Sequence, residues 1–162
     1  MSIPGESELP NLGEILGRVL GRVPERERPL LIAVAERLAA QRYRGWAERP
    51  EASGHRTRLL ACAAREEEIA DRVEALYPGA AATQRDILAR HPDLEELNRS
   101  LFADRPLAQQ LAMQAQGERL GAATWRALAR AELEATARET LLACAELEDA
   151  SAVVLESILT GR

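Results

Sequence analysis

The chain of 162 residues carries a formal net charge of −5 at pH 7, and 29% of its residues are charged while only 3% are aromatic. This length suits one domain with a sizeable core, which must be built from Leu, Ala, Ile and Val. The acidic balance argues against nucleic acid or an anionic membrane as the main partner, and no apolar run approaches the roughly 18 residues of a transmembrane span.

The composition also indicates the fold class. Ala, Leu, Glu and Arg are abundant and β-branched runs are nearly absent, which favours helices. The first eight residues lack a basic-then-apolar signal pattern, and the two cysteines lack the spacing of a disulfide framework. We therefore expect an all-α protein of the cytoplasm.

The N-terminal part, residues 1–24, is expected to form a loop followed by one short helix. Asn11 with Glu14 three positions later resembles a capping box. Apolar residues at helical spacing then mark one face: Leu12, Ile15, Leu16, Val19, Leu20 and Val23. Such a stripe suits either a flap docked on the rest of the domain or a partner-binding arm, and the flap is the commoner use.

Residues 25–162 are expected to form one helical domain with four long helices. Pro29 suits the first turn of the first helix, Ser53 is a candidate cap of the second, and Pro78-Gly79 ends the second. The expected ranges are about 29–48, 53–77, 106–130 and 133–159. Between the second and third, the segment of about 78–105 forms a long crossover with two short helices, capped by Thr83 and Asp93 and separated by His91-Pro92.

Two segments recur at one offset. Glu36-Arg37-Leu38 returns as Glu118-Arg119-Leu120, and the five letters of residues 59–63 return unchanged at 141–145. The offsets agree (118 − 36 = 82 and 141 − 59 = 82), so no gap is needed between the two matches. We interpret this match as a duplicated helical hairpin that forms a four-helix bundle with pseudo-twofold symmetry.

Four glutamates interrupt apolar helix faces: Glu36, Glu66, Glu118 and Glu148. Helical neighbours three, four and seven positions away share a face. Around Glu66 these neighbours are Leu59, Cys62, Ala63, Ile69, Ala70 and Val73, whereas Glu67 and Glu68 have charged neighbours. Buried unpaired carboxylates are costly, so the cluster needs a bound cation, protonation or pairing with arginine. Carboxylate oxygens suit iron, manganese, magnesium or calcium.

The segments 35–44 and 66–70, with their second-half copies, resemble the rubrerythrin branch of the ferritin-like superfamily over about residues 29–159. Members carry one Glu on each of helices one and three and a Glu-x-x-His on each of helices two and four. The resemblance implies that Glu36, Glu66, Glu118 and Glu148 are metal ligands in a two-metal site. It implies iron or manganese as the cofactor and, by analogy, a homodimer. The two histidine positions hold Ile69 and Ser151, so both nitrogen ligands are missing.

Other candidates have simpler interpretations. His55 and His91 suit surface or capping positions. Cys62 and Cys144 suit small buried core residues, with a thiol beside the carboxylates as the sharper alternative. Tyr43 and Trp125 suit core fillers or hydrogen-bond donors to the site. Arg44 and Arg126 are the candidates to neutralise the glutamates if no metal binds.

The sequence therefore leaves three hypotheses open, one of which is a helical enzyme or binder that uses a pocket not evident from the sequence. The other two are of different class. The first is a divergent ferritin-like protein that binds divalent metal through the four glutamates, without the imidazoles that efficient redox catalysis would need. The second is a metal-free bundle that serves as an interaction or assembly module. No nucleophile triad, phosphate loop or zinc spacing points to another enzyme class.

Overall fold

The computed structural model describes residues 9–161, and every regular element in that range is helical. The α-helices are α1 (Leu12–Leu20), α2 (Arg28–Ala47), α3 (Arg56–Ala75), α4 (Ala80–Arg90), α5 (Leu94–Phe102), α6 (Leu107–Ala131) and α7 (Ala135–Thr160). Two 3₁₀ turns, η2 (Glu25–Glu27) and η3 (Pro50–His55), precede α2 and α3. The predicted all-α class is confirmed, and the helices outnumber the four long ones because the crossover and the N-terminal segment add three.

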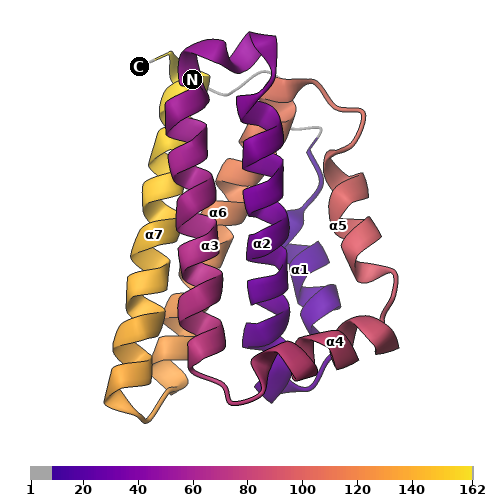
Figure 1. Cartoon of the computed structure of the whole chain (residues 1–162), viewed down its shortest axis with the longest axis vertical. Coiled ribbons are helices and arrows are strands. Elements are labelled where there is room, and N and C mark those ends of the chain that lie inside the picture. The colour runs from indigo at the N-terminus through magenta and orange to yellow at the C-terminus, as the bar shows by residue number, and fades with distance from the viewer. Residues whose placement is uncertain (1–8, 162) are drawn as a thin grey trace.

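The four long helices lie side by side (Figure 1). Helix α2 packs along α3 and α6 packs along α7, while α3 and α7 join the two pairs. Helix α5 lies beside α2, α1 contacts α6, and α4 contacts α2 and crosses near the lower end of the view in Figure 1. The segment predicted as a long crossover thus contributes α4 and α5, which cover one side of α2.

Several predicted helix ends are confirmed. Asn11 caps α1, since its Oδ1 accepts a hydrogen bond of 3.1 Å from the backbone N–H of Glu14. Pro29 lies in the first turn of α2, where its missing N–H costs nothing. Asp93 occupies the position before α5, although its side chain binds Arg22 rather than the helix end.

Two predicted caps are wrong. Ser53 lies inside η3, and α3 begins three residues later at Arg56 because the chain after Pro50 first forms a tighter 3₁₀ turn. Thr83 lies inside α4, which already starts at Ala80. Gly79 precedes that helix with φ of 72°, a left-handed conformation that glycine adopts without a steric cost.

Two apolar core clusters lie on either side of the glutamates along the long helices. One cluster contains Tyr43, Trp46 and Leu155, and the other contains Ile69 and Trp125. Each long helix contributes to both clusters, and its inward glutamate lies between the two contributions. In α2, for example, Ala33 belongs to one cluster and Ala40 to the other, with Glu36 between them. The glutamates therefore form a polar layer across the middle of an apolar interior.

Helix α1 docks on the long helices, as the flap interpretation predicts. Leu12 packs against the first core cluster and Leu20 against the second. Val19 and Leu20 also contact a third cluster of Val23, Leu31, Ile87 and Leu94, which ties α1 to α2, α4 and α5. The expected N-terminal loop lies outside the described residues up to residue 8.

The 82-residue offset recurs in contacts between helices. Arg37 of α2 binds Glu67 and Glu74 of α3. At the matching positions (119 − 37, 149 − 67 and 156 − 74 all equal 82), Arg119 of α6 binds Asp149 and Glu156 of α7. The same arrangement of charges thus joins each pair of long helices.

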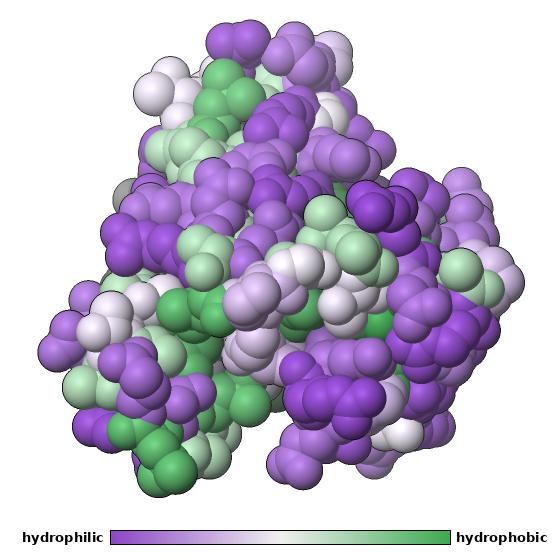
Figure 2. Space-filling view, turned by 60° about the horizontal axis from the view of Figure 1, so that its bottom comes forward, coloured by the Kyte–Doolittle hydropathy of each residue, from purple (hydrophilic) through white to green (hydrophobic). Residues whose placement is uncertain are grey.

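The surface is largely hydrophilic at the end of the molecule that Figure 2 turns toward the viewer, with hydrophobic residues in separate groups. The largest exposed hydrophobic side chains are Leu133, Val153 and Leu142, with exposures of 92%, 57% and 43%. In the part of the chain that the structure covers, no helix is both long and apolar enough to cross a membrane.

Candidate metal centre

The four predicted glutamates are all buried. The exposed fractions are 7% for Glu36, 0% for Glu66, 1% for Glu118 and 2% for Glu148. By comparison, Glu67 is only partly buried and pairs with Arg37 and Arg44. Helical periodicity therefore separated the inward glutamate of α3 from its neighbour correctly.

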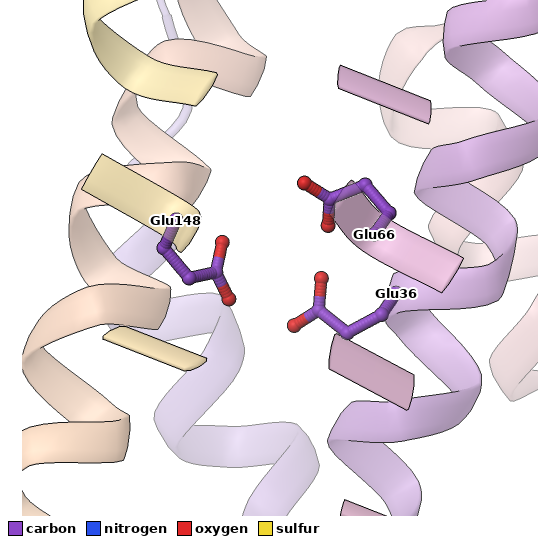
Figure 3. Close-up of side chains that lie close together, drawn as sticks. All are labelled: Glu36, Glu66 and Glu148. Carbon is purple, nitrogen blue, oxygen red and sulfur yellow. The ribbon is translucent and has the colours of Figure 1, made fainter. Parts of the chain in front are cut away.

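Three of the four carboxyl groups converge. One ligand oxygen each from Glu36, Glu66 and Glu148 lies within 4.8 Å of the other two. Figure 3 shows Glu36 and Glu66 pointing toward Glu148, which faces them from α7. A spacing of this size lets one cation contact all three residues after small side-chain adjustments, since oxygen ligands lie at about 2.0–2.6 Å from a divalent metal.

Glu66 gives the most direct indication that the glutamates bind a cation or a proton. Both of its oxygens are buried, and no donor among residues 9–161 reaches either of them. A buried ionised carboxylate without a donor is strongly unfavourable. The side chain therefore requires either a cation or a proton.

Glu118 lies beside the trio and has its own partners. Tyr43 donates its hydroxyl to Glu118 Oε1 at 2.5 Å, and Gln114 donates Nε2–H to the same oxygen at 2.8 Å. Glu148 accepts one hydrogen bond of 2.9 Å from Trp125 Nε1. Tyr43 and Trp125 are thus both core fillers and donors to the glutamate layer.

Burial shifts the acidity of the trio. The loss of water raises the pKa of Glu36, Glu66 and Glu148 above the usual value for glutamate, and the charge of neighbouring glutamates raises it further. The three carboxyl groups lie close enough to exchange hydrogen bonds when one of them is protonated. Without a cation, Glu36, Glu66 and Glu148 therefore retain protons at pH values where ordinary glutamates are ionised.

The two positions that the resemblance assigns to histidine hold no nitrogen ligand. Ile69 and Ser151 are both fully buried. Ser151 Oγ accepts a hydrogen bond of 3.1 Å from Arg65 Nε, and Arg65 Nη2 lies 3.6 Å from Cys62 Sγ. Burial raises the pKa of the Cys62 thiol, which makes it a poor thiolate donor at neutral pH.

The two arginines proposed to neutralise the glutamates have other partners. Arg44 pairs with Glu67, and Arg126 pairs with Asp149, both on the outside of the long helices. His55 and His91 are partly exposed, and neither belongs to the glutamate trio. Cys144 is buried in the second core cluster, as the core interpretation predicts.

Arg42 is a largely buried cation near the glutamates that the sequence pattern did not single out. Its guanidinium donates to Asn98 Oδ1 at 2.6 Å and to Gln114 Oε1 at 3.0 Å. Its neighbours three or four positions away on the same face of α2 are buried: Leu38, Ala39 and Trp46. The interruption of an apolar face that identified Glu36 is therefore also present at Arg42.

The donor set fits one hard divalent cation better than two. Three carboxylates from three helices supply oxygen ligands of the kind that iron(II), manganese(II) and magnesium accept. A second ion would need Glu118, whose Oε1 is already bonded, and a ligand at position 69 or 151, where neither an imidazole nor a carboxylate is present. Comparisons of this chain with protein-family models, curated proteins and solved structures yield no match.

Proposed function

We propose that this chain is a divergent ferritin-like protein that binds one divalent metal ion through Glu36, Glu66 and Glu148. The observation that carries the proposal is Glu66, whose two buried oxygens lack donors and face two further carboxylates. One divalent ion would satisfy all three residues and offset most of their charge. The recurring arginine contacts of α2–α3 and α6–α7 support the underlying duplicated hairpin.

Iron(II) or manganese(II) is the proposed ion, because both accept oxygen ligands alone. With three carboxylates and no imidazole, the residues suit retention of the ion, with its remaining positions filled by water. Among residues 9–161, positions 69 and 151 hold Ile and Ser and supply no nitrogen ligand for a second metal position, so the proposal is limited to binding of the ion. Glu118, held by Tyr43 and Gln114, would accept a hydrogen bond from a metal-bound water through its unpartnered Oε2.

The test is metal analysis of protein purified without chelator and then loaded with manganese(II) or, without oxygen, with iron(II). We expect about one ion per chain in the wild type. Glu66→Gln should lose the ion, because an amide supplies a weak neutral ligand. Glu118→Gln should keep it, and Glu67→Gln, one residue away on the exposed side of α3, is the matched control. Absence of stoichiometric metal after loading would exclude the proposal.

A second candidate function has its own observation. Leu133, Leu142 and Val153 are exposed on α7 and on the connection before it. An assembly module with a metal-free, partly protonated glutamate layer, pairing with a second copy along α7, would cover them. Light scattering of the wild type and of Leu142→Glu/Val153→Glu tests this candidate: a dimer that becomes a monomer supports it, and a monomeric wild type excludes it.

A further inference from the structure

A mostly apolar pocket of about 190 Å³ lies between α1 and the long helices and is partly open to solvent. Its walls come from the apolar face of α1, the adjacent face of α2, helix α5 and the middle of α6. For scale, an engineered cavity of about 150 Å³ with a similar lining binds benzene. The pocket therefore has room for a ligand larger than benzene, part of which can extend through the opening to solvent.

The apolar face of helix α1 stays partly exposed where it lines the pocket. Its apolar residues lie on one face, yet none of them is fully buried in the structure. Ile15, Leu16 and Val19 line the pocket and so retain partial exposure. Covering this apolar area would be favourable in proportion to the surface removed from water.

Arg42 sets the charge of one end of the pocket. It lines the pocket, stacks on Phe102 at 3.9 Å and donates only to the neutral oxygens of Asn98 and Gln114. Its Nε is buried without a partner, and no ion pair of Arg42 occurs within residues 9–161. Burial lowers the pKa of Arg42 to about 10, although the nearby charges of Glu118, Glu66 and Glu36 act in the opposite direction. A charged donor of this kind is typical of carboxylate recognition.

The pocket also reaches the candidate metal centre. Glu36 and Glu148 both line it, and Glu36 keeps the largest exposure of the four glutamates. Arg42 lies six residues after Glu36 on the same helix (42 − 36 = 6), which corresponds to about 9 Å along the axis. A chain anchored at Arg42 and extending along α2 would therefore pass Glu36.

We propose that this pocket binds a small aliphatic carboxylate, with its carboxylate on Arg42 and its alkyl chain between α1 and α2. Binding itself needs no metal. The position of the alkyl chain beside a metal ion rests on the proposed function. The ligand class follows from the apolar walls and from Arg42, which lies in the same lining as Glu36, Glu95 and Glu148 but forms no direct ion pair among the described residues.

Isothermal titration calorimetry with sodium octanoate tests the proposal, with octan-1-ol and octylamine as matched probes that change only the head group. We expect octanoate to bind and both matched probes to bind at least about tenfold more weakly, since a charge-assisted hydrogen bond is lost. Arg42→Gln should weaken octanoate binding by about tenfold or more. Arg44→Gln, two residues along α2 and paired with Glu67, is the control that should leave it unchanged.

A second pair of variants tests the location. Gly117 lines the pocket, and a Cβ atom added at this position would meet no neighbouring atom within 4 Å, so Gly117→Leu is the variant chosen to fill the pocket. Gly45→Leu adds the same side chain at an exposed helical position with equally open space. We expect Gly117→Leu to abolish octanoate binding and Gly45→Leu to preserve it, with both variants folded by circular dichroism.

The titrations are run on chelator-treated and on manganese-loaded protein, so that the two proposals fail separately. Octanoate binding to protein that takes up no manganese supports the pocket and excludes the metal function. Stoichiometric manganese binding without octanoate binding supports the metal function and excludes the pocket. Tighter binding of octylamine, or octanoate binding that is insensitive to Arg42→Gln, would overturn the assignment of the head group.

Discussion

Gly121 of α6 lies directly against the carboxylate of Glu148 of α7. A Cβ atom at position 121 would meet Glu148 Oε1 at 2.4 Å, Cδ at 2.6 Å and Oε2 at 2.9 Å. The absence of a side chain on α6 is therefore what lets Glu148 turn inward toward Glu36 and Glu66. The inward position of the Glu148 carboxylate therefore requires a residue without a side chain at position 121 of α6.

Gly121→Ala should displace the Glu148 carboxylate and weaken the site. We expect a loss of about 1–3 kcal/mol in the free energy of unfolding, as is typical of overpacking in a core, together with weaker manganese binding. Gly117→Ala, one turn earlier on α6 with open space around it, is the control. It should be stabilising by about 0.5–1 kcal/mol through helix propensity alone. Urea denaturation measures the free energy of unfolding of both variants. Equal changes in Gly121→Ala and Gly117→Ala would contradict the role of Gly121.

The stability of the metal-free protein should fall as pH rises from about 5 to 8. The pKa of Glu36, Glu66 and Glu148 is raised above the ordinary 4.5, so the folded chain holds protons that the unfolded chain has released. Their contribution is fully present below pH 4.5 and is lost as pH rises through the folded pKa values. Asp93, whose pKa is lowered to about 2 by the hydrogen bond from Arg22, titrates below this window.

Thermal denaturation in chelator across that pH range measures the slope. Glu66→Gln should flatten it and raise the stability at pH 8, because one buried charge is removed. Saturating manganese should stabilise the wild type at pH 8 and not Glu66→Gln. A wild type that becomes more stable with rising pH would contradict the buried, protonated layer.

Tyr43→Phe should destabilise the protein without removing the metal. The hydroxyl of Tyr43 donates to Glu118, which lies outside the trio. Loss of this buried, charge-assisted hydrogen bond costs about 1.5–3 kcal/mol. Chemical denaturation reports the loss, and metal analysis should still find about one ion per chain. A variant that folds normally and has lost its metal would place Tyr43 in the metal centre instead.

Trp125 should report metal binding by fluorescence. The chain has two tryptophans, and Trp125 Nε1 donates to Glu148, whereas Trp46 Nε1 donates to Gln110. In Trp46→Phe, the remaining emission of Trp125 should change in intensity or wavelength when manganese(II) binds. In Trp125→Phe, the emission of Trp46 should change much less. A larger response from Trp46 would contradict binding at Glu148.

The local pattern of the sequence was sufficient to predict which segments form long helices and which glutamates on them are buried. The apolar periodicity around Glu66 and the charged neighbours of Glu67 distinguish two adjacent residues correctly, because a residue's place on a helix face depends only on its own helix. Ser53 and Thr83 show the limit of this reasoning. A capping residue fits a helix start, but the 3₁₀ turn after Pro50 and the left-handed Gly79 decided where those helices begin.

By itself, the sequence determined an all-helical chain with one inward carboxylate on each long helix, since spacing along a helix fixes which side chains share a face. Only the tertiary structure decided that Glu36, Glu66 and Glu148 converge while Glu118 is bonded to Tyr43 and Gln114. It also placed Arg42 in a pocket under α1. These relationships join residues from different helices, and they depend on how the helices rotate and approach one another, for example where Gly121 admits Glu148.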